Sequence, residues 1–255
     1  MKITTFNIRC CYAGYDKNQS FVFRAGLIRD AVLREKPDVI AFQEVKPDIL
    51  SLLKTIMPDY TIYGHGRMAD FGSEGVYTAI RNETTELFGL ETFWLSPTPN
   101  VPESRYEEQS QCPRICCKTL IYDKKSGKNF YVYNIHLDHL ATPAQEKQLR
   151  LTVDRMKEKE FDFPAILLGD FNLVDGKSAE IEWLEAQDVF PLKRISKTYP
   201  ATFHNFGKNP DYGTIDYIYA TPDISESAKK VKLWKDECEG IYLSDHYPIS
   251  VEVKL

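Results

Sequence analysis

Hydrophobic positions along the chain follow two periodicities, which together predict many strands and a few helices. From Phe21 to Glu35 apolar residues recur at helical spacing, and Pro37 marks the end of that helix. The stretch KITTFNI, residues 2–8, alternates between faces and is rich in β-branched side chains, which is typical of a strand. Further strands are predicted at residues 38–45, 60–64, 75–81, 85–95, 114–123, 129–137, 164–169, 213–220, 229–235 and 247–254.

Three more helices are predicted, at residues 47–57, at residues 178–186 and from Thr142 onward. Thr142 and Gln145 match the N-cap and the capping-box acceptor of the last helix, with Pro143 at its first helical position. The buried face of this helix is expected to carry Leu149, Val153 and Met156.

Several predicted strands are continuous apolar runs, which indicates an α/β fold whose sheets are covered by helices. The 255 residues contain no internal repeat and no low-complexity linker, so residues 1–255 are expected to form a single domain. Residues 96–113, rich in Pro, Ser and Glu, are predicted to form a long loop of the kind that often carries function.

Composition narrows the class of protein. A formal net charge of −5 disfavours a general nucleic-acid binder, which would need a basic surface. The opening MKITTFNIRC shows no secretory signal, and no stretch approaches the ~20 apolar residues of a membrane span. The six cysteines form no paired C-x-x-C modules, so neither a zinc site nor a disulfide framework is expected. We therefore expect a cytoplasmic protein with reduced, mostly buried thiols.

Polar residues stand at the ends of several predicted strands. If these strands lie side by side, their ends meet at one rim, where open α/β sheets bind ligands. Taken singly, each residue has an ordinary interpretation: Asp-x-Asn as a turn, a glutamate as a solvated strand end, a histidine as a core residue. The set as a whole is harder to attribute to chance, and it comprises Asn7, Glu44, His136, Asp170, Asn172, Asp216, Asp245 and His246.

The chemistry of this set favours a hard divalent cation. Carboxylate and amide oxygens suit Mg²⁺, Mn²⁺ or Ca²⁺, whereas the lack of a thiolate cluster makes zinc less attractive. A dication beside two imidazoles is suited to the hydrolysis of phosphate esters, since the metal neutralises charge and a histidine moves a proton.

The segments TFNI, FQEV, SEGVYTAI, YNIHLDH, LLGDFN, TIDYIYA and LSDHYPI, in this order, resemble the endonuclease/exonuclease/phosphatase superfamily with its DNase I-like fold. The resemblance covers essentially the whole chain and implies a four-layer α/β/β/α sandwich. The stretches FWLSPTP and PRICC look like a bacterial branch of this superfamily.

The resemblance implies a metal centre. Glu44 would be the principal metal ligand, with Asn7 and Asp245 as further ligands or organisers. Asp170 and Asn172 would position the nucleophilic water and the scissile phosphate.

It also implies roles for two histidines. His246 would contact the phosphate or act as general base, oriented by Asp216. His136 would contact the phosphate or protonate the leaving oxygen, oriented by Glu74. Whether His246 or Asp170 takes the proton of the water stays open.

Two further residues are candidates for substrate binding. Arg114 could clamp a phosphate, although a surface salt bridge is an equal alternative. His139 could contact the substrate or lie in solvent.

We therefore expect a monomeric Mg²⁺- or Mn²⁺-dependent phosphodiesterase or phosphomonoesterase, with a phosphorylated substrate of unknown identity. One alternative is a nuclease or deadenylase acting on single-stranded nucleic acid, although nucleic acid is not the favoured partner. Another is a binding module that has lost catalysis. In a nuclease, aromatic side chains such as Tyr106, Phe171, Phe203 and Phe206 could stack bases, although packing in the core or in loops is the preferred interpretation.

Overall fold

The computed structural model describes residues 1–11, 16–158, 161–188 and 190–255. Its longer strands are β1 (Lys2–Asn7), β2 (Val39–Val45), β3 (Tyr60–Gly66), β4 (Gly75–Arg81), β5 (Thr85–Trp94), β6 (Ile115–Asp123), β7 (Lys128–His136), β8 (Ala165–Asp170), β10 (Asp216–Ala220), β11 (Lys229–Leu233) and β14 (Ile249–Glu252). Three two-residue strands accompany them, β9 (Lys193–Arg194), β12 (Glu237–Cys238) and β13 (Ile241–Tyr242). The helices are η1 (Lys17–Gln19), α1 (Phe21–Glu35), α2 (Pro47–Ile56), α3 (Thr142–Lys157), α4 (Ala179–Glu185) and α5 (Pro222–Ser225).

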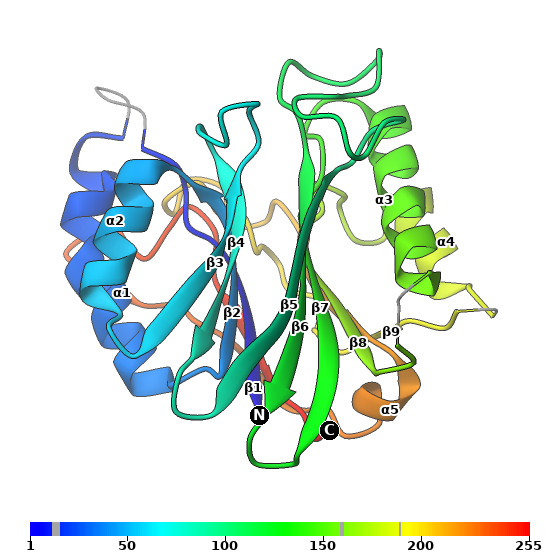
Figure 1. Ribbon diagram of the computed structural model, residues 1–255. Helices are drawn as coiled ribbons and strands as arrows, with labels where there is room; N and C mark the ends of the chain where they lie inside the picture. The colour runs from blue at the N-terminus through cyan, green and yellow to red at the C-terminus, as the bar shows by residue number, and fades with distance from the viewer. Residues whose placement is uncertain (12–15, 159–160, 189) are drawn as a thin grey trace.

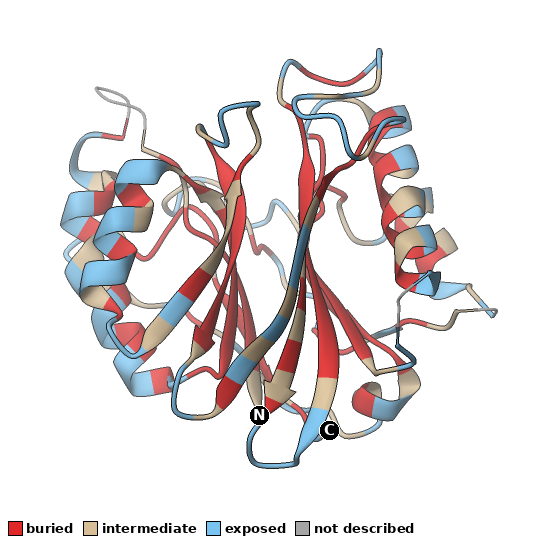
Figure 2. Cartoon of the chain, viewed as in Figure 1, coloured by how far each residue is buried: buried red, intermediate tan, exposed pale blue. Residues whose placement is uncertain are grey.

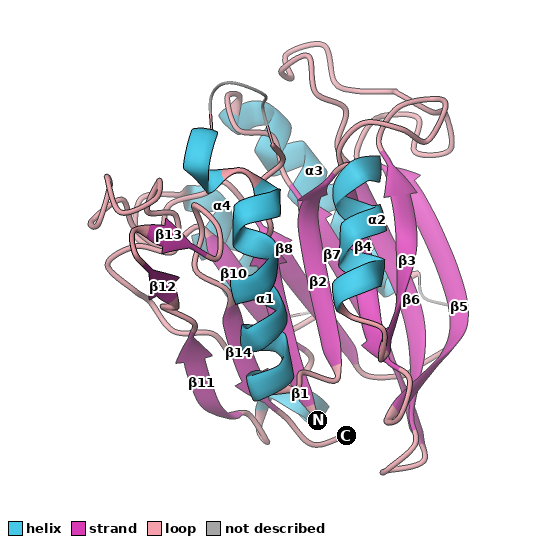
Figure 3. Ribbon diagram, turned by 90° about the vertical axis from the view of Figure 1, so that its left-hand side faces the viewer, coloured by secondary structure: helices cyan, strands magenta, loops and turns pink. Residues whose placement is uncertain are grey.

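Two six-stranded sheets pack face to face between helices (Figure 1). The first sheet has the order β11–β14–β1–β2–β4–β3, and the second has the order β5–β6–β7–β8–β10–β9. Helices α1 and α2 cover the first sheet, as Figure 3 shows, and α3 and α4 cover the second. The four-layer, DNase I-like sandwich implied by the sequence is therefore confirmed.

The buried strands supply side chains to two cores at once. In β2, Val39 and Ala41 face the other sheet, whereas Ile40 and Phe42 pack under α1 and α2. This double burial explains the continuous apolar runs in the sequence, and Figure 2 shows the central strands buried along most of their length.

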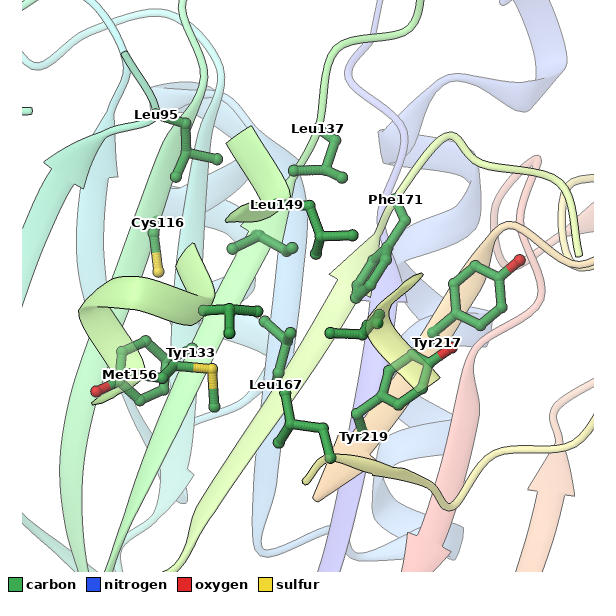
Figure 4. Close-up of a cluster of buried hydrophobic side chains, with 14 of the residues drawn as sticks. Leu95, Cys116, Tyr133, Leu137, Leu149, Met156, Leu167, Phe171, Tyr217 and Tyr219 are labelled. Carbon is green, nitrogen blue, oxygen red and sulfur yellow. The ribbon is translucent and has the colours of Figure 1, made fainter. Parts of the chain in front are cut away.

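The outer core of the second sheet packs under α3. Leu149, Val153 and Met156 of this helix are fully buried against strand residues such as Leu167 (Figure 4). The predicted apolar face of α3 is therefore confirmed.

The predicted start of α3 is only partly correct. The helix begins at Thr142, but its N-cap is Ala141 and no side chain caps it. The carboxylate of Asp138 instead accepts the N–H groups of Leu140 and Ala141, which replaces the expected capping box. Gln145 is thereby free to donate to other carbonyls, those of Asp138 and Asn172.

None of the six cysteines, all of which lie in the described ranges, forms a disulfide. Cys10, Cys116 and Cys117 are buried, while Cys238 is exposed, so the prediction of mostly buried thiols holds for half of them. Within the described ranges, no helix is both long and apolar enough to cross a membrane.

The topology brings many strand ends to one edge, the one opposite the chain termini and uppermost in Figure 1. The parallel pairs β1–β2 and β7–β8 both end there, with His136 beside Asp170 in register. The antiparallel neighbours β4, β6, β10 and β14 begin there, because each runs opposite to its partner. Residues at the ends of the first group and at the starts of the second therefore converge.

Gly169 allows β8 to approach β7 closely just before this edge. Its φ is +144°, and a Cβ at this position would collide with the backbone carbonyl of Ile135. We expect Gly169→Ala to lower the free energy of unfolding by about 2–4 kcal/mol, through backbone strain and steric overlap. Urea denaturation of the variant measures the effect.

Gly26→Ala is the matched control, because Gly26 lies in α1 with no heavy atom within 4 Å of the added Cβ. That substitution should be neutral or stabilising by up to about 1 kcal/mol. Equal stability of Gly169→Ala and wild type would contradict the close approach of the two strands.

Candidate active site

The predicted site residues lie together at the edge where these strand ends converge, called here the joint edge of the two sheets. They surround a cleft of about 370 Å³. Nine of them line it: Glu44, Glu74, Arg114, His136, His139, Asp170, Asn172, Asp245 and His246. The other two, Asn7 and Asp216, are buried behind the lining and hydrogen-bond to it.

Asn7 joins the two halves of the site. Its Nδ2 donates to Oε1 of Glu44 at 3.0 Å and to Oδ2 of Asp170 at 2.9 Å. Its Oδ1 accepts the backbone N–H of Arg9. Because Glu44 belongs to the first sheet and Asp170 to the second, this one amide fixes the two sheets to each other at the site.

A β-bulge aims Glu44 at the cleft. The β2–β4 register shifts between Phe42 and Val45, and Glu44 has a φ of 62°, in the left-handed region. Its Oε2 accepts the backbone N–H of Cys10 at 3.0 Å. Burial would raise the pKa of Glu44, but His136 and the hydrogen bonds from Cys10 and Asn7 hold that pKa well below its usual range, so the carboxylate is ionised.

Asp170 serves both the turn and the site. Its Oδ1 accepts the backbone N–H of Asn172 at 2.9 Å, which closes the local turn. Its Oδ2 faces both histidines, 3.6 Å from Nε2 of His136 and 3.7 Å from Nε2 of His246. Burial and the nearby Asp216 raise the pKa of Asp170.

The two histidines occupy different electrostatic environments. Nδ1 of His246 lies 2.9 Å from Oδ2 of Asp216. Burial lowers the pKa of His246, but Asp216 and Asp170 overcome it and raise the pKa to about 10. Burial and the guanidinium of Arg114 instead hold the pKa of His136 well below its usual range. At neutral pH, His246 therefore carries a positive charge and His136 is neutral.

Asp245 lies beside two further charged groups. Nε of Arg9 is 3.6 Å from its Oδ2, and Ser244 donates to its Oδ1. Burial raises the pKa of Asp245, and the charge of Glu44 adds to this, which places the two carboxylates in one electrostatic environment.

Glu74 lines the cleft and contacts Arg67 and Cys10, whereas the resemblance implies that it orients His136. Its Oε2 lies 3.0 Å from Nη1 of Arg67, and Cys10 donates to its Oε1. Its role in orienting His136 stays a prediction.

Arg114 is not the surface residue of the salt-bridge alternative, because only 4% of it is exposed. Its Nη2 lies 3.0 Å from Nδ1 of His139. His139 is exposed, yet it lines the cleft together with Arg114.

Of the four aromatic residues considered for base stacking, Phe203 lines the cleft, its ring 5.1 Å from that of His246. Phe171 is fully buried against Tyr217 and Tyr219, as Figure 4 shows, so the preferred interpretation of this residue as a packing residue is confirmed.

Several residues of the site were missed at the sequence level. Arg9, Arg67 and Cys112 line the cleft, and Tyr212 and Ile215 complete its aromatic and aliphatic side. These residues could have been identified from the sequence by their position next to strand ends. The predicted site residues were identified by the same feature.

Arg24 was missed as well, although it supports the site from behind. It is fully buried in α1, and its guanidinium donates to the carbonyls of Ile8 and Leu243 at 2.8 and 2.6 Å. These carbonyls belong to the segments that follow Asn7 and precede Asp245. Arg24 therefore ties together two loops that carry site residues.

The side-chain ligand atoms at the joint edge fit a hard divalent cation. One atom each of Cys10, Glu44 and Glu74 lie within 4.8 Å of one another. Ionised carboxylate oxygen is the donor that Mg²⁺ and Mn²⁺ prefer, and a single thiol among carboxylates does not make a zinc site. A second cluster, Asp170, Asp216 and His246, is engaged in the contacts described above.

This architecture, with carboxylates and imidazoles gathered at the joint edge of two sheets, places the chain among the DNase I-like hydrolases of phosphate esters. Residues 4–246 match the family model described as Endonuclease/Exonuclease/phosphatase family, and the chain belongs to that family.

Several relatives share the fold over the full chain. An endonuclease/exonuclease/phosphatase from Bacteroides vulgatus is 28% identical with a TM-score of 0.91, covering 100% of this chain and 98% of that one. The mannosyl-6-phosphatase Bt3783 of Bacteroides thetaiotaomicron is 24% identical with a TM-score of 0.84, covering 100% of both chains.

A curated relative, tyrosyl-DNA phosphodiesterase 2 of Danio rerio, is 24% identical over 230 residues, 84% of this chain. The alignment covers 57% of that relative, so the chain spans little more than half of its length.

Proposed function

We propose that this protein is a hydrolase of phosphate esters that depends on Mg²⁺ or Mn²⁺ and acts through the residues at the joint edge. The observation that carries the proposal is the bridge from Asn7 to both Glu44 and Asp170, because it unites carboxylates of both sheets in one site. Relatives whose names denote a phosphatase and a phosphodiesterase support the reaction class.

Glu44 and Asp245 would hold the cation, with Glu74 near enough to share in its binding. When bound, the metal would neutralise phosphate charge and stabilise the developing oxyanion. As oriented, Asn7 turns its N–H groups toward Glu44 and Asp170, which supports a role as organiser rather than as ligand.

The remaining residues would act on water and phosphate. Asp170, whose Oδ2 lies between the two imidazoles, would accept the proton of the attacking water. His246, kept positively charged by Asp216, would contact the phosphate. His136 would donate a hydrogen bond from its neutral ring, and Asn172 would help to position the phosphate.

A nuclease or deadenylase is the second candidate. Phe203 in the cleft and the similarity to tyrosyl-DNA phosphodiesterase 2 are the observations in its favour. The net charge of −5 argues against a long nucleic-acid footprint. A silent binding module is disfavoured because the full set of catalytic side chains is present.

The same proposal includes a single domain over residues 1–255, since both sheets supply one site. It also includes a cytoplasmic monomer. The cysteines, which form no disulfide within the described residues, support the compartment.

Metal removal tests the reaction class. The protein with Mn²⁺ should hydrolyse 4-nitrophenyl phosphate, bis(4-nitrophenyl) phosphate or a short single-stranded oligonucleotide, and excess EDTA should reduce the rate by at least about 10³-fold, because charge neutralisation is lost. Readdition of Mn²⁺ should restore the rate. Ca²⁺, added in place of Mn²⁺, is the comparison ion. Full activity in EDTA, or inactivity on all three substrates, would exclude the proposal.

A further inference from the structure

The cleft has two chemically distinct ends. At one end lie Arg67 and Arg114, close to the carboxylate of Glu74. At the other end lie Phe203 and Tyr212, whose rings meet edge to face with centroids 5.0 Å apart. One end of the cleft therefore presents two guanidiniums, and the other end presents two aromatic rings.

The basic end is the buried end. Arg114 is 4% exposed and Glu74 is 7% exposed, whereas Tyr212 at the opposite end is 46% exposed. A water-sized hollow of about 10 Å³ lies at the basic end, between these residues and His136.

Each of the two guanidiniums has an N–H donor that makes no hydrogen bond within the described residues. Nη1 of Arg67 binds Glu74 and its Nη2 donates to Sγ of Cys112 at 3.5 Å, while Nη2 of Arg114 contacts His139. Within the part of the chain that the structure describes, Nε of Arg67 and Nε of Arg114 are buried and have no hydrogen-bond partner. Buried donors of this kind are costly unless a ligand satisfies them.

The shape of the guanidinium group supports a phosphate at this end. Arg67 and Arg114 lie here together with two carboxylates, those of Glu44 and Glu74, so the match rests on donor geometry and not on an excess of charge. The planar fork of a guanidinium matches the paired oxygens of a phosphate.

The wall behind the arginines is held in place. Ser110, in the loop that leads to Arg114, donates its backbone N–H to Oδ2 of Asp138 at 3.3 Å, and its hydroxyl donates to the same oxygen. Asp138 in turn accepts the N–H groups of Leu140 and Ala141, just before α3. The loop that leads to Arg114 is therefore fixed against the segment that precedes α3.

We infer that Arg67 and Arg114 form a subsite for the unesterified oxygens of a terminal phosphate, so that the protein prefers phosphate monoesters whose organic part lies against Phe203 and Tyr212. The inference rests on the proposed function, since it specifies the substrate class of the same site. In the reaction, the oxygen of water bonds to phosphorus and the ester P–O bond breaks. One proton of that water ends on the leaving oxygen, so the products are an alcohol and inorganic phosphate.

The test compares a monoester with a diester of the same leaving group. Wild type with Mn²⁺ should show a kcat/KM at least about tenfold higher for 4-nitrophenyl phosphate than for bis(4-nitrophenyl) phosphate. Arg114→Gln and Arg67→Gln should each lower the monoester kcat/KM by about 10²-fold, mainly through KM, and the diester value by less than about fivefold. Arg114→Lys should recover part of the loss by restoring the charge.

Arg150→Gln is the matched control, because Arg150 lies exposed on α3 in an i,i+4 pair with Glu146. It should leave both substrates unaffected. A binding measurement tests the subsite without kinetics, in case Arg114→Gln fails to fold. In EDTA, inorganic phosphate should raise the Tm of wild type more than that of Arg67→Gln.

Equal losses on monoester and diester, a wild type that prefers the diester, or a phosphate effect on Tm that is as large in Arg67→Gln as in wild type would each overturn the subsite. Failure of wild type to hydrolyse either ester with Mn²⁺ would instead count against the proposed function, so the two failures are distinguishable.

Discussion

Glu44→Gln is expected to lower kcat/KM for a chromogenic phosphate ester by at least about 10³-fold at fixed Mn²⁺. The amide is nearly the same size as the carboxylate, but it carries no charge, and Glu44 is ionised in the structure. The substitution removes the charge that would hold the cation while keeping the hydrogen-bond geometry with Asn7 and Cys10 nearly intact. Steady-state kinetics at several Mn²⁺ concentrations measures the loss.

Glu252→Gln is the control for a general effect of losing one glutamate. Glu252 lies at the far end of β14 and pairs with Lys230, remote from the joint edge. This variant should keep full activity. If Glu44→Gln retained more than a tenth of the wild-type value with an unchanged Mn²⁺ dependence, the assignment of Glu44 as a metal ligand would be wrong.

Asp216→Asn is expected to have the second large effect, a decrease of about 10²–10⁴-fold in kcat. Asp216 faces Nδ1 of His246 at 2.9 Å, so it fixes the orientation of the ring and supports its positive charge. Asparagine preserves the shape of the side chain but removes the charge. Asp236→Asn, which changes an aspartate paired with Arg34 near β12, is the control and should be silent.

The same variant should change the pH behaviour of His246 in a defined direction. Because Asp216 raises the pKa of His246, the variant should lower that pKa by about 1–3 units, which NMR titration of the imidazole can follow. A histidine whose folded-state pKa is raised stabilises the fold fully below its unfolded pKa and loses this contribution as pH rises through the folded value. Wild type should therefore exceed Asp216→Asn in stability most clearly below about pH 6.5, with the difference narrowing toward pH 10. An unchanged pKa of His246 would show that Asp216 does not act through this ring.

The convergence of the site could be predicted from sequence because it follows from strand polarity. Asn7, Glu44, His136 and Asp170 end parallel strands, and parallel strands in one sheet end at the same edge. Asp216 was expected inside a strand at residues 213–220, whereas β10 begins at Asp216 and runs antiparallel to β8, in register with Asp170.

Other parts could not be predicted, because they depend on contacts between segments that are distant in sequence. The side chain of Gln145 has the residue type of a capping box, but the carboxylate of Asp138 already accepts the N–H groups of Leu140 and Ala141. Arg24 looked like one more charge in a helix. Its burial depends on carbonyls of Ile8 and Leu243, which lie 16 and 219 residues away.

The position of the long loop also depends on contacts that the sequence does not reveal. Residues 96–113 were recognisable as a loop, and their composition gave no sign of where they would lie. Their anchoring through Ser110 to Asp138 places Cys112 and Arg114 at the basic end of the cleft. A loop of this length finds its position through a few side-chain contacts rather than through a repeating pattern, and periodicity cannot report those contacts.

Binding of Mn²⁺ measured by electron paramagnetic resonance of the free ion, on wild type and Glu44→Gln in the absence of substrate, tests the central claim most directly. Wild type should bind the ion with an affinity at least about tenfold higher than that of the variant, since one ionised ligand is lost. Equal affinity in the two proteins, or no binding by wild type, would contradict the claim that side chains from both sheets create a metal-dependent phosphoesterase site.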